Sequence, residues 1–190
     1  MTALAADYQP SSGWTDDELE HIPDGIRYEI EDGNLVVSPR PTLWHQEACS
    51  IVKAVLQEQC PPDQWPVQEG EIRVYADPGI DQLRAPDVML VPKSLVHKDA
   101  IRGWVHPREV ALAAEVVSAG SRTADRATKV VVYASWGIPL YLRLETKPEV
   151  VLCEYRLDRA TKRYGEPTEH RGAFTTDDPF PFELDLSRWN

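Results

Sequence analysis

The chain has 190 residues, of which 42% are hydrophobic and 27% charged, and its formal net charge is −11. This length and composition predict one globular domain whose core needs no disulfide and no structural metal. The acidic balance argues against a protein that covers nucleic acid with a broad surface, because affinity for a phosphate backbone comes largely from lysine and arginine. A local nucleic-acid site remains compatible with it, since the field around that site decides binding and divalent cations would offset acids within it.

No apolar run is long enough to cross a bilayer, and the opening stretch MTALAADYQPSSGW lacks the basic segment and apolar core of a signal peptide. We therefore expect a cytoplasmic protein with no membrane partner, in which residues 1–14 form a flexible lead-in and residues 15–190 a single domain. The three cysteines include no CxxC motif and no Cys/His cluster, which argues against a structural zinc site. Cys49 and Cys60 fall in one helix-like segment and are interpreted as inert packing residues.

The first third of the chain predicts a short helix, a hairpin and a longer helix. Residues 14–25 carry acids at the start of a helical segment that a proline and a glycine end. Residues 26–39 alternate apolar and polar positions on either side of Asp32 and Gly33, a pair typical of a hairpin turn. Residues 41–60 have apolar positions at helical spacing.

The rest of the chain predicts strands with one further helix. Residues 109–117 are almost continuously apolar, which is typical of a strand covered on both faces of a sheet. A helix follows, beginning at Ser121 or Thr123 and ending near Gly137. The other expected segments are a strand over 65–76, a turn over 77–82, a buried strand over 83–92, a polar connection with a short helix within 93–107, a strand over 138–145, a meander over 149–170 and a closing segment over 173–186. This order indicates a mixed α/β sheet with helices on its faces.

Two acids occupy positions where apolar side chains would be expected. Asp87 follows a proline at the start of VMLV, and Glu115 lies inside the strand VALAAEVV. If the two strands are neighbours, both carboxylates face one pocket and suit Mg²⁺ or Mn²⁺, with the Val116 carbonyl as a further ligand. The alternatives are that Asp87 caps a turn at a strand edge and that Glu115 forms a buried ion pair with an arginine.

Three residues of the following helix, Asp125, Lys129 and Tyr133, are spaced by four and so share one face. They form either a surface Asp–Lys pair beside a tyrosine at the sheet edge, or a group that faces the carboxylate pocket. In the second case Lys129 would hold the attacking water or stabilise charge on a phosphate, and Asp125 would orient it.

Four stretches resemble one known family: YEIEDGNLVVSPRPTLWHQ, RAPDVMLV, AAEVVSAGSRTADRATKVVVYASWGIPLYLRLE and PFPFELDL. In this order, over about residues 15–187, the chain resembles the bacterial Uma-type restriction endonucleases of the PD-(D/E)xK nuclease superfamily. The resemblance implies a restriction-endonuclease-like fold, with a mixed central sheet flanked by helices, an N-terminal hairpin and antiparallel C-terminal additions. It also implies a metal-dependent phosphodiesterase site.

Carried over to this chain, the resemblance makes Asp87 the acid of the PD element and Glu115 the acid of the ExK element. Glu29 becomes an upstream acid that assists metal or water binding, a role for which Glu31 competes. His45 matches the family's histidine at the start of the first core helix, and a local hydrogen bond at the helix start would explain it equally well.

The chain departs from the superfamily pattern at Val117, where a standard ExK element has a lysine. Uma-type sequences carry a lysine on the next helix instead, which here is Lys129. Smaller departures are SAGS in place of a turn with a proline, and LRLE, where Arg143 and Glu145 stand in place of a tryptophan and an aspartate. These departures remove no implied metal ligand.

Two functions from different classes follow. The first is a Mg²⁺- or Mn²⁺-dependent DNA endonuclease in which Asp87 and Glu115 hold the metal, Glu29 assists and Lys129 positions the nucleophilic water. A homodimer would let it cut both strands. The alternative is a catalytically silent nuclease-fold scaffold for interaction or oligomerisation, which the acidic balance favours. The presence of Glu29, Asp87, Glu115 and Lys129 together favours the nuclease. Carboxylates in a pocket destabilise the fold once no metal neutralises them, so an inactive nuclease would be expected to lose its acids first. Hydrolysis of another phosphorylated small molecule is also compatible with these residues.

Overall fold

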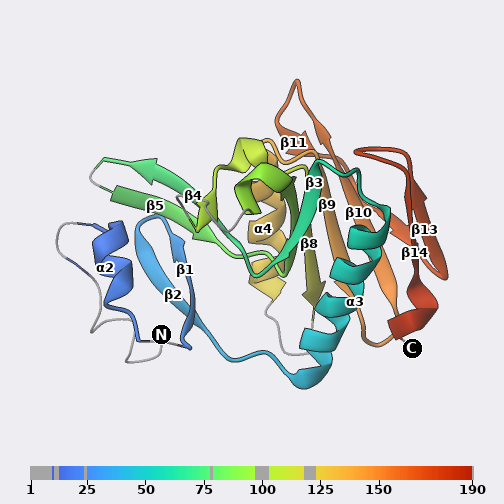
Figure 1. Ribbon diagram of the computed structural model, residues 1–190, viewed down its shortest axis with the longest axis horizontal. Helices are drawn as coiled ribbons and strands as arrows, with labels where there is room; N and C mark the ends of the chain where they lie inside the picture. Colours follow the sequence, from blue (N-terminus) through green and yellow to red (C-terminus); the bar gives the residue numbers. More distant parts are fainter. Residues whose placement is uncertain are drawn as a thin grey trace.

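The computed structural model describes residues 10, 13–23, 25–77, 79–96, 103–117 and 123–189, with side chains for all of them except 123–126. Within these ranges, none of the helices has both the length and the apolar character needed to cross a membrane. Along the chain (Figure 1) the elements are α2 (Asp16–Glu20), β1 (Arg27–Glu31), β2 (Asn34–Ser38), α3 (Leu43–Gln59), β3 (Gln64–Gln68), β4 (Glu71–Ala76), β5 (Gly79–Arg84), β6 (Val88–Pro92), η1 (Lys93–Val96), β7 (Trp104–Val105), η2 (Pro107–Glu109), β8 (Leu112–Val117), α4 (Thr123–Ser135), β9 (Leu140–Glu145), β10 (Val151–Asp158), β11 (Arg163–Tyr164), β12 (Thr168–His170), β13 (Ala173–Thr176), β14 (Phe182–Asp185) and η3 (Leu186–Trp189).

Most of these strands belong to two sheets. In the larger sheet the strand order is β11-β10-β9-β8-β6-β3, with β12 beside β10, and in the smaller sheet it is β2-β1-β5-β4-β7. β8 and β9 are parallel and α4 connects them, whereas β6 is antiparallel to β8 and β10 is antiparallel to β9. This arrangement confirms the predicted mixed α/β class.

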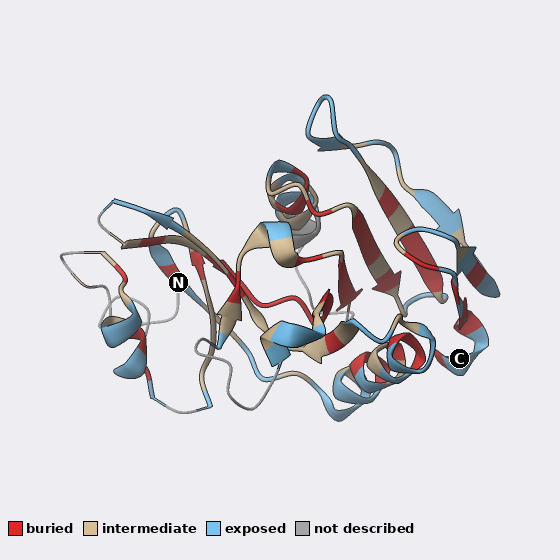
Figure 2. Cartoon of the chain, turned by 45° about the horizontal axis from the view of Figure 1, so that its top comes forward, coloured by how far each residue is buried: buried red, intermediate tan, exposed pale blue. Residues whose placement is uncertain are grey.

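Helices cover both faces of the larger sheet. Leu56 of α3 joins Ala114 in one hydrophobic cluster, and Tyr133 of α4 joins Ala113 in the other. Successive residues of β8 therefore point to opposite faces, as expected for a strand. Every residue of β8 is buried, and the central strands in Figure 2 are mostly drawn as buried. Because helices cover both faces of β8, apolar residues occupy nearly every position of this strand, and Glu115 is surrounded by them.

The smaller sheet has its own core, which contains Trp14, Leu19, Ile30 and Ile80. Trp14, expected to belong to the lead-in, is only 1% exposed, and its backbone oxygen accepts the N–H of Ile80 at 2.7 Å. Residues 1–9 and 11–12 of the expected lead-in lie outside the described residues.

The hairpin predicted over residues 26–39 is confirmed by the antiparallel pairing of β1 and β2. Its turn residues Asp32 and Gly33 have φ of 48° and 73°, and positive φ at both central residues is what a type I′ turn requires. On β1, Arg27 and Glu29 share the face opposite Ile30, which is fully buried. The hairpin thereby presents a basic and an acidic side chain on the same side.

The single strand predicted over residues 65–76 is wrong, because this segment forms β3 in the larger sheet and β4 in the smaller one. Between them Glu69 has φ of 53°, and its N–H donates to the backbone oxygen of Asp87. At the next residue, Gly70, a Cβ would lie 2.3 Å from Cε of Met89, so a side chain there would have to displace the Met89 side chain. The chain therefore bends here and passes from one sheet to the other.

The turn predicted over residues 77–82 is also wrong in extent, since β5 already begins at Gly79. After β5, residues 85–87 lead the chain back from the smaller sheet to β6 of the larger one. Together with the bend at residues 69–70, this return places Asp87 where the two sheets meet.

Gly79 is a position where one added methyl group is expected to destabilise the smaller sheet. A Cβ there would lie 2.1 Å from the backbone oxygen of Trp14, and no rotamer change relieves a clash with backbone. We expect Gly79→Ala to lower the free energy of unfolding by about 1–3 kcal/mol, measured by urea denaturation. Gly165→Ala is the control, because its Cβ would meet nothing within 4 Å. Equal stability of the two variants would contradict the prediction.

Candidate active site

Antiparallel pairing of β6 and β8 brings Asp87 and Glu115 together. Val88 lies opposite Ala114, so continuing the register by one residue places Asp87 across from Glu115. Asp87 is 2% exposed and Glu115 7%, and within the described ranges Arg84 is the only other buried polar or charged residue. Buried charge is thus concentrated at this point of the fold.

Three donors converge on the Asp87 carboxylate. Arg27 Nη2 donates to Oδ1 at 2.8 Å, the Val116 N–H donates to Oδ2 at 2.8 Å, and His45 Nε2 lies 3.2 Å from Oδ2. Burial raises the pKa of Asp87, but the hydrogen bonds and charges of His45 and Arg27 outweigh it and bring the pKa to about 2. Asp87 is therefore ionised at neutral pH, and its hydrogen bond in turn raises the pKa of His45.

Glu115 has an ammonium group and a phenol on the same oxygen. Lys129 Nζ and Tyr133 Oη each donate to Oε1 at 2.8 Å. Burial raises the pKa of Glu115 to about 7, with the charge of Lys129 opposing the rise and the charges of Asp87 and Glu29 adding to it. Burial beside Glu115 also raises the pKa of Tyr133, which keeps the phenol a hydrogen-bond donor.

Lys129 joins acids from two distant parts of the chain. Besides its contact with Glu115, Nζ lies 3.5 Å from Oε1 of Glu29, and the same oxygen accepts the N–H of Ala85 at 3.2 Å. Burial lowers the pKa of Lys129, but the charges of Glu115 and Glu29 outweigh it and raise the pKa above its ordinary value. Lys129 is therefore a protonated cation.

The helical position of the lysine follows from the connection between β8 and β9. α4 makes this connection and packs on the sheet face that carries Glu115, so a residue of its second turn reaches the carboxylate. Val117, where the superfamily has its lysine, is buried in β8 and pairs with Glu145 of β9. Tyr133 is fully buried against Glu115 and is not an edge residue.

Three predicted residues remain to be placed: Asp125, Glu31 and Val116. The Asp125 side chain lies outside the described residues. Glu31, the competitor of Glu29, lies 3.5 Å from Arg84 and pairs with it. The Val116 N–H is used by Asp87, and a backbone hydrogen bond with Val116 contributes to the raised pKa of His45. Because the N–H and C=O of a strand residue point the same way, the Val116 carbonyl faces this group too.

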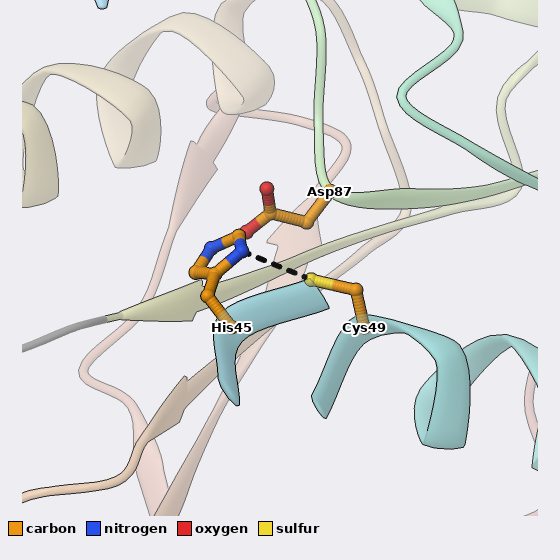
Figure 3. A group of neighbouring side chains, drawn as sticks. All are labelled: His45, Cys49 and Asp87. Atoms are coloured by element: carbon orange, nitrogen blue, oxygen red, sulfur yellow. Dashed lines mark hydrogen bonds and ion pairs between the residues drawn. The ribbon is translucent and has the colours of Figure 1, made fainter. Parts of the chain in front are cut away.

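Three residues of the site were not predicted from the sequence: Arg27, Glu69 and Cys49. Arg27 Nη1 lies 3.4 Å from Oε1 of Glu69, and Cys49 Sγ lies 3.5 Å from Nδ1 of His45 (Figure 3). Arg27 could have been found from its place two residues before Glu29 on one strand face. Cys49 could have been found from its spacing of four from His45 on a helix. No sequence pattern indicates Glu69, because its position depends on the bend between the sheets.

The donor atoms of this site fit a hard divalent cation. Carboxylate oxygens of Asp87 and Glu115, with the Val116 carbonyl, are the oxygen ligands that Mg²⁺ and Mn²⁺ accept. Arg27 and Lys129 now balance the two acids, each through a 2.8 Å contact. A bound cation would therefore compete with these two side chains for the carboxylate oxygens.

Comparison with known proteins gives this site a context. The family model Uma2, described as "Putative restriction endonuclease", matches residues 16–187. The chain belongs to the Uma2 family. This membership confirms the resemblance seen in the sequence.

Among solved structures, the chain is similar to a crystal structure from Anabaena variabilis titled as "a putative nuclease belonging to DUF820". The TM-score is 0.67 at 14% sequence identity, and the match covers 93% of this chain and 97% of the other. This similarity supports the predicted restriction-endonuclease-like fold. No curated protein matches the sequence.

Proposed function

We propose that this Uma2 protein is a divalent-metal-dependent endonuclease that hydrolyses phosphodiester bonds of DNA. The observation that carries the proposal is a pair of buried carboxylates, with protonated Lys129 between Glu115 and Glu29. Asp87 lies immediately before β6, and Glu115 lies on the neighbouring strand β8. Membership of a nuclease family and the nuclease fold support the same reaction class.

Asp87 and Glu115 would hold Mg²⁺ or Mn²⁺, with the Val116 carbonyl as a third protein ligand. When bound, such a cation supplies positive charge beside the scissile phosphate and makes water more acidic. The Val116 N–H fixes the orientation of the Asp87 carboxylate at 2.8 Å, so this ligand is held in place by backbone.

Lys129 acts in this proposal as a cation rather than as a base, because the charges of Glu115 and Glu29 keep it protonated. Its ammonium group would orient the nucleophilic water and stabilise negative charge that develops on the phosphate oxygens. Glu29 assists by holding Lys129 and the water, and its own orientation is fixed by the Ala85 N–H.

The overall charge of −11 argues that DNA would bind at the site itself and not over a broad surface. Arg27 and Lys129 are the cations that lie against its acids, and the metal would add to the positive field there. We therefore expect DNA affinity to depend strongly on the divalent cation. A homodimer that cuts both strands and a cytoplasmic location remain predictions.

The proposal is tested by nicking of supercoiled plasmid and by calorimetric titration with Mn²⁺, with and without duplex DNA. Wild-type protein should nick plasmid in Mg²⁺ or Mn²⁺ and not in EDTA. Glu115→Gln should reduce cleavage by about 10³-fold, whereas Glu166→Gln makes the same chemical change at an exposed residue and should not. Wild-type protein that binds no cation even with DNA present would refute the proposal and leave the scaffold function.

A further inference from the structure

A second group of ligand atoms lies next to the paired acids. The donor atoms of His45, Cys49 and Asp87 all lie within 4.8 Å of one another (Figure 3). Cys49 Sγ lies 3.5 Å from His45 Nδ1, and His45 Nε2 lies 3.2 Å from Asp87 Oδ2. The group therefore combines a sulfur, a nitrogen and an oxygen donor around a single imidazole.

The fold holds all three side chains in place. His45 and Cys49 are four residues apart on α3, so they project from the same helix face. The Thr42 side chain caps this helix by accepting the N–H of His45 at 3.2 Å. Cys49 is 2% exposed and packs in the core beneath α3, and the Val116 N–H orients Asp87 by donating to Oδ2.

This cluster does not suit the chemistry of a cysteine nucleophile. Burial and the neighbouring charge of Asp87 raise the pKa of the Cys49 thiol far above its ordinary value, so no thiolate is available at neutral pH. A coordinated transition metal ion changes this, because it deprotonates a thiol that binds to it.

The donor atoms of His45, Cys49 and Asp87 do not suit Mg²⁺, the hard cation that we expect at Asp87 and Glu115. Mg²⁺ takes oxygen ligands in octahedral geometry, whereas thiolate and imidazole select Zn²⁺ and similar ions. Three protein ligands with water in the fourth position are a common arrangement for tetrahedral zinc.

We propose that His45, Cys49 and Asp87 form a second metal site that takes Zn²⁺ or a similar transition-metal ion in competition with Mg²⁺ for Asp87. Binding releases the thiol proton of Cys49 and leaves one nitrogen of a neutral His45 as a ligand. Because both ions would share the one Asp87 carboxylate and would repel each other across it, occupation of this site weakens Mg²⁺ binding at the paired acids. The inhibitory consequence rests on the proposed nuclease function, whereas the binding itself does not.

Co²⁺ is the direct probe, because a cobalt–thiolate bond gives a charge-transfer absorption band and tetrahedral Co²⁺ gives intense visible bands. Wild-type protein should show both on titration with Co²⁺, and Zn²⁺ should remove them by displacement. Cys49→Ser and Cys49→Ala should lose the charge-transfer band and weaken Zn²⁺ binding by at least about tenfold. Cys60→Ser, which changes the cysteine at the other end of α3, should behave like wild type.

Thermal melting of each variant checks that it folds, and the two Cys49 variants differ in polarity so that one is expected to remain folded. A wild-type protein without the cobalt–thiolate band would overturn the proposal, and so would a folded Cys49 variant that keeps it. Where plasmid nicking is observed, inhibition of the wild type should need less Zn²⁺ than inhibition of Cys49→Ala, with each protein compared with its own rate in the absence of Zn²⁺. Absence of nicking in all proteins bears on the proposed function alone, because the cobalt spectrum needs neither DNA nor activity.

Discussion

Replacing Asp87 by asparagine is expected to abolish DNA cleavage and to lower the free energy of unfolding by about 3 kcal/mol. The carboxylate accepts from Arg27 on one oxygen, and from the Val116 N–H and His45 on the other. An asparagine amide presents one acceptor and one donor, so its NH₂ group must face a donor on one of the two sides. The variant thus loses a metal ligand and leaves buried polar groups unpaired.

This stability effect should depend on pH in a defined direction. The lowered pKa of Asp87 stabilises the fold fully above the ordinary value of 3.8, and this contribution is lost as the pH falls toward about 2. The raised pKa of His45 stabilises the fold fully below its ordinary value of 6.5, and this contribution is lost as the pH rises past the raised value. The difference between wild type and Asp87→Asn should be largest between about pH 4 and pH 6.5.

Thermal unfolding followed across this pH range measures the effect, and about 3 kcal/mol corresponds to a lower Tm by roughly 6–12 °C for a domain of this size. Asp177→Ala removes a carboxylate at an exposed position and serves as the control. A variant that melts like wild type and still binds Mn²⁺ would show that Asp87 is neither a structural anchor nor a ligand.

Replacing Lys129 by methionine is expected to reduce cleavage by about 10²–10³-fold while cation binding persists. Methionine keeps most of the length and apolar character of the side chain but removes the charge that lies 2.8 Å from Glu115 and 3.5 Å from Glu29. Without this charge, burial and the neighbouring acids would raise the pKa of Glu115 further, so part of the lost ion pair is recovered by protonation. We expect a lower kcat with a smaller change in KM.

Single-turnover cleavage and Mn²⁺ calorimetry on the same preparations separate this role from metal binding. Lys129→Arg should restore part of the rate, because it returns a cation to the position. Lys53→Met removes a lysine from α3 and controls for the change in net charge. If Lys129→Met cleaves at the wild-type rate, the lysine only balances buried charge.

The sequence allowed the fold class and much of the element order to be predicted because local patterns carry that information. The turn at Asp32 and Gly33 and the doubly covered strand around Glu115 are each specified by a few adjacent residues. The bend at Glu69 and Gly70 escaped prediction, because it lies within a stretch whose residues otherwise alternate like one strand. Its contacts are tertiary, since the Glu69 N–H donates to the backbone oxygen of the distant Asp87.

The candidate site, like the fold, could be predicted from the sequence only in part. Asp87, Glu115 and Lys129 stand out as charges in or beside apolar segments, and the structure places them in contact or in register. Arg27 was not singled out and Cys49 was interpreted as an inert packing residue, because an arginine on a strand and a cysteine on a helix are ordinary by themselves. Their significance depends on which elements face them, and only the assembled fold supplies that information.

A lysine carried by a helix takes its position from the packing of that helix. Tyr133, one turn after Lys129, donates to the same oxygen of Glu115 and packs edge to face on Tyr141, which stacks on Tyr155. These rings fix the rotation of α4 about its own axis and so determine where the ammonium group points. A lysine on the strand would owe its position to backbone pairing, which side-chain changes at a distance hardly disturb. Under the proposed function, these aromatic residues should therefore tune the reaction rate through the position of Lys129, although they are not themselves proposed as ligands or catalytic groups.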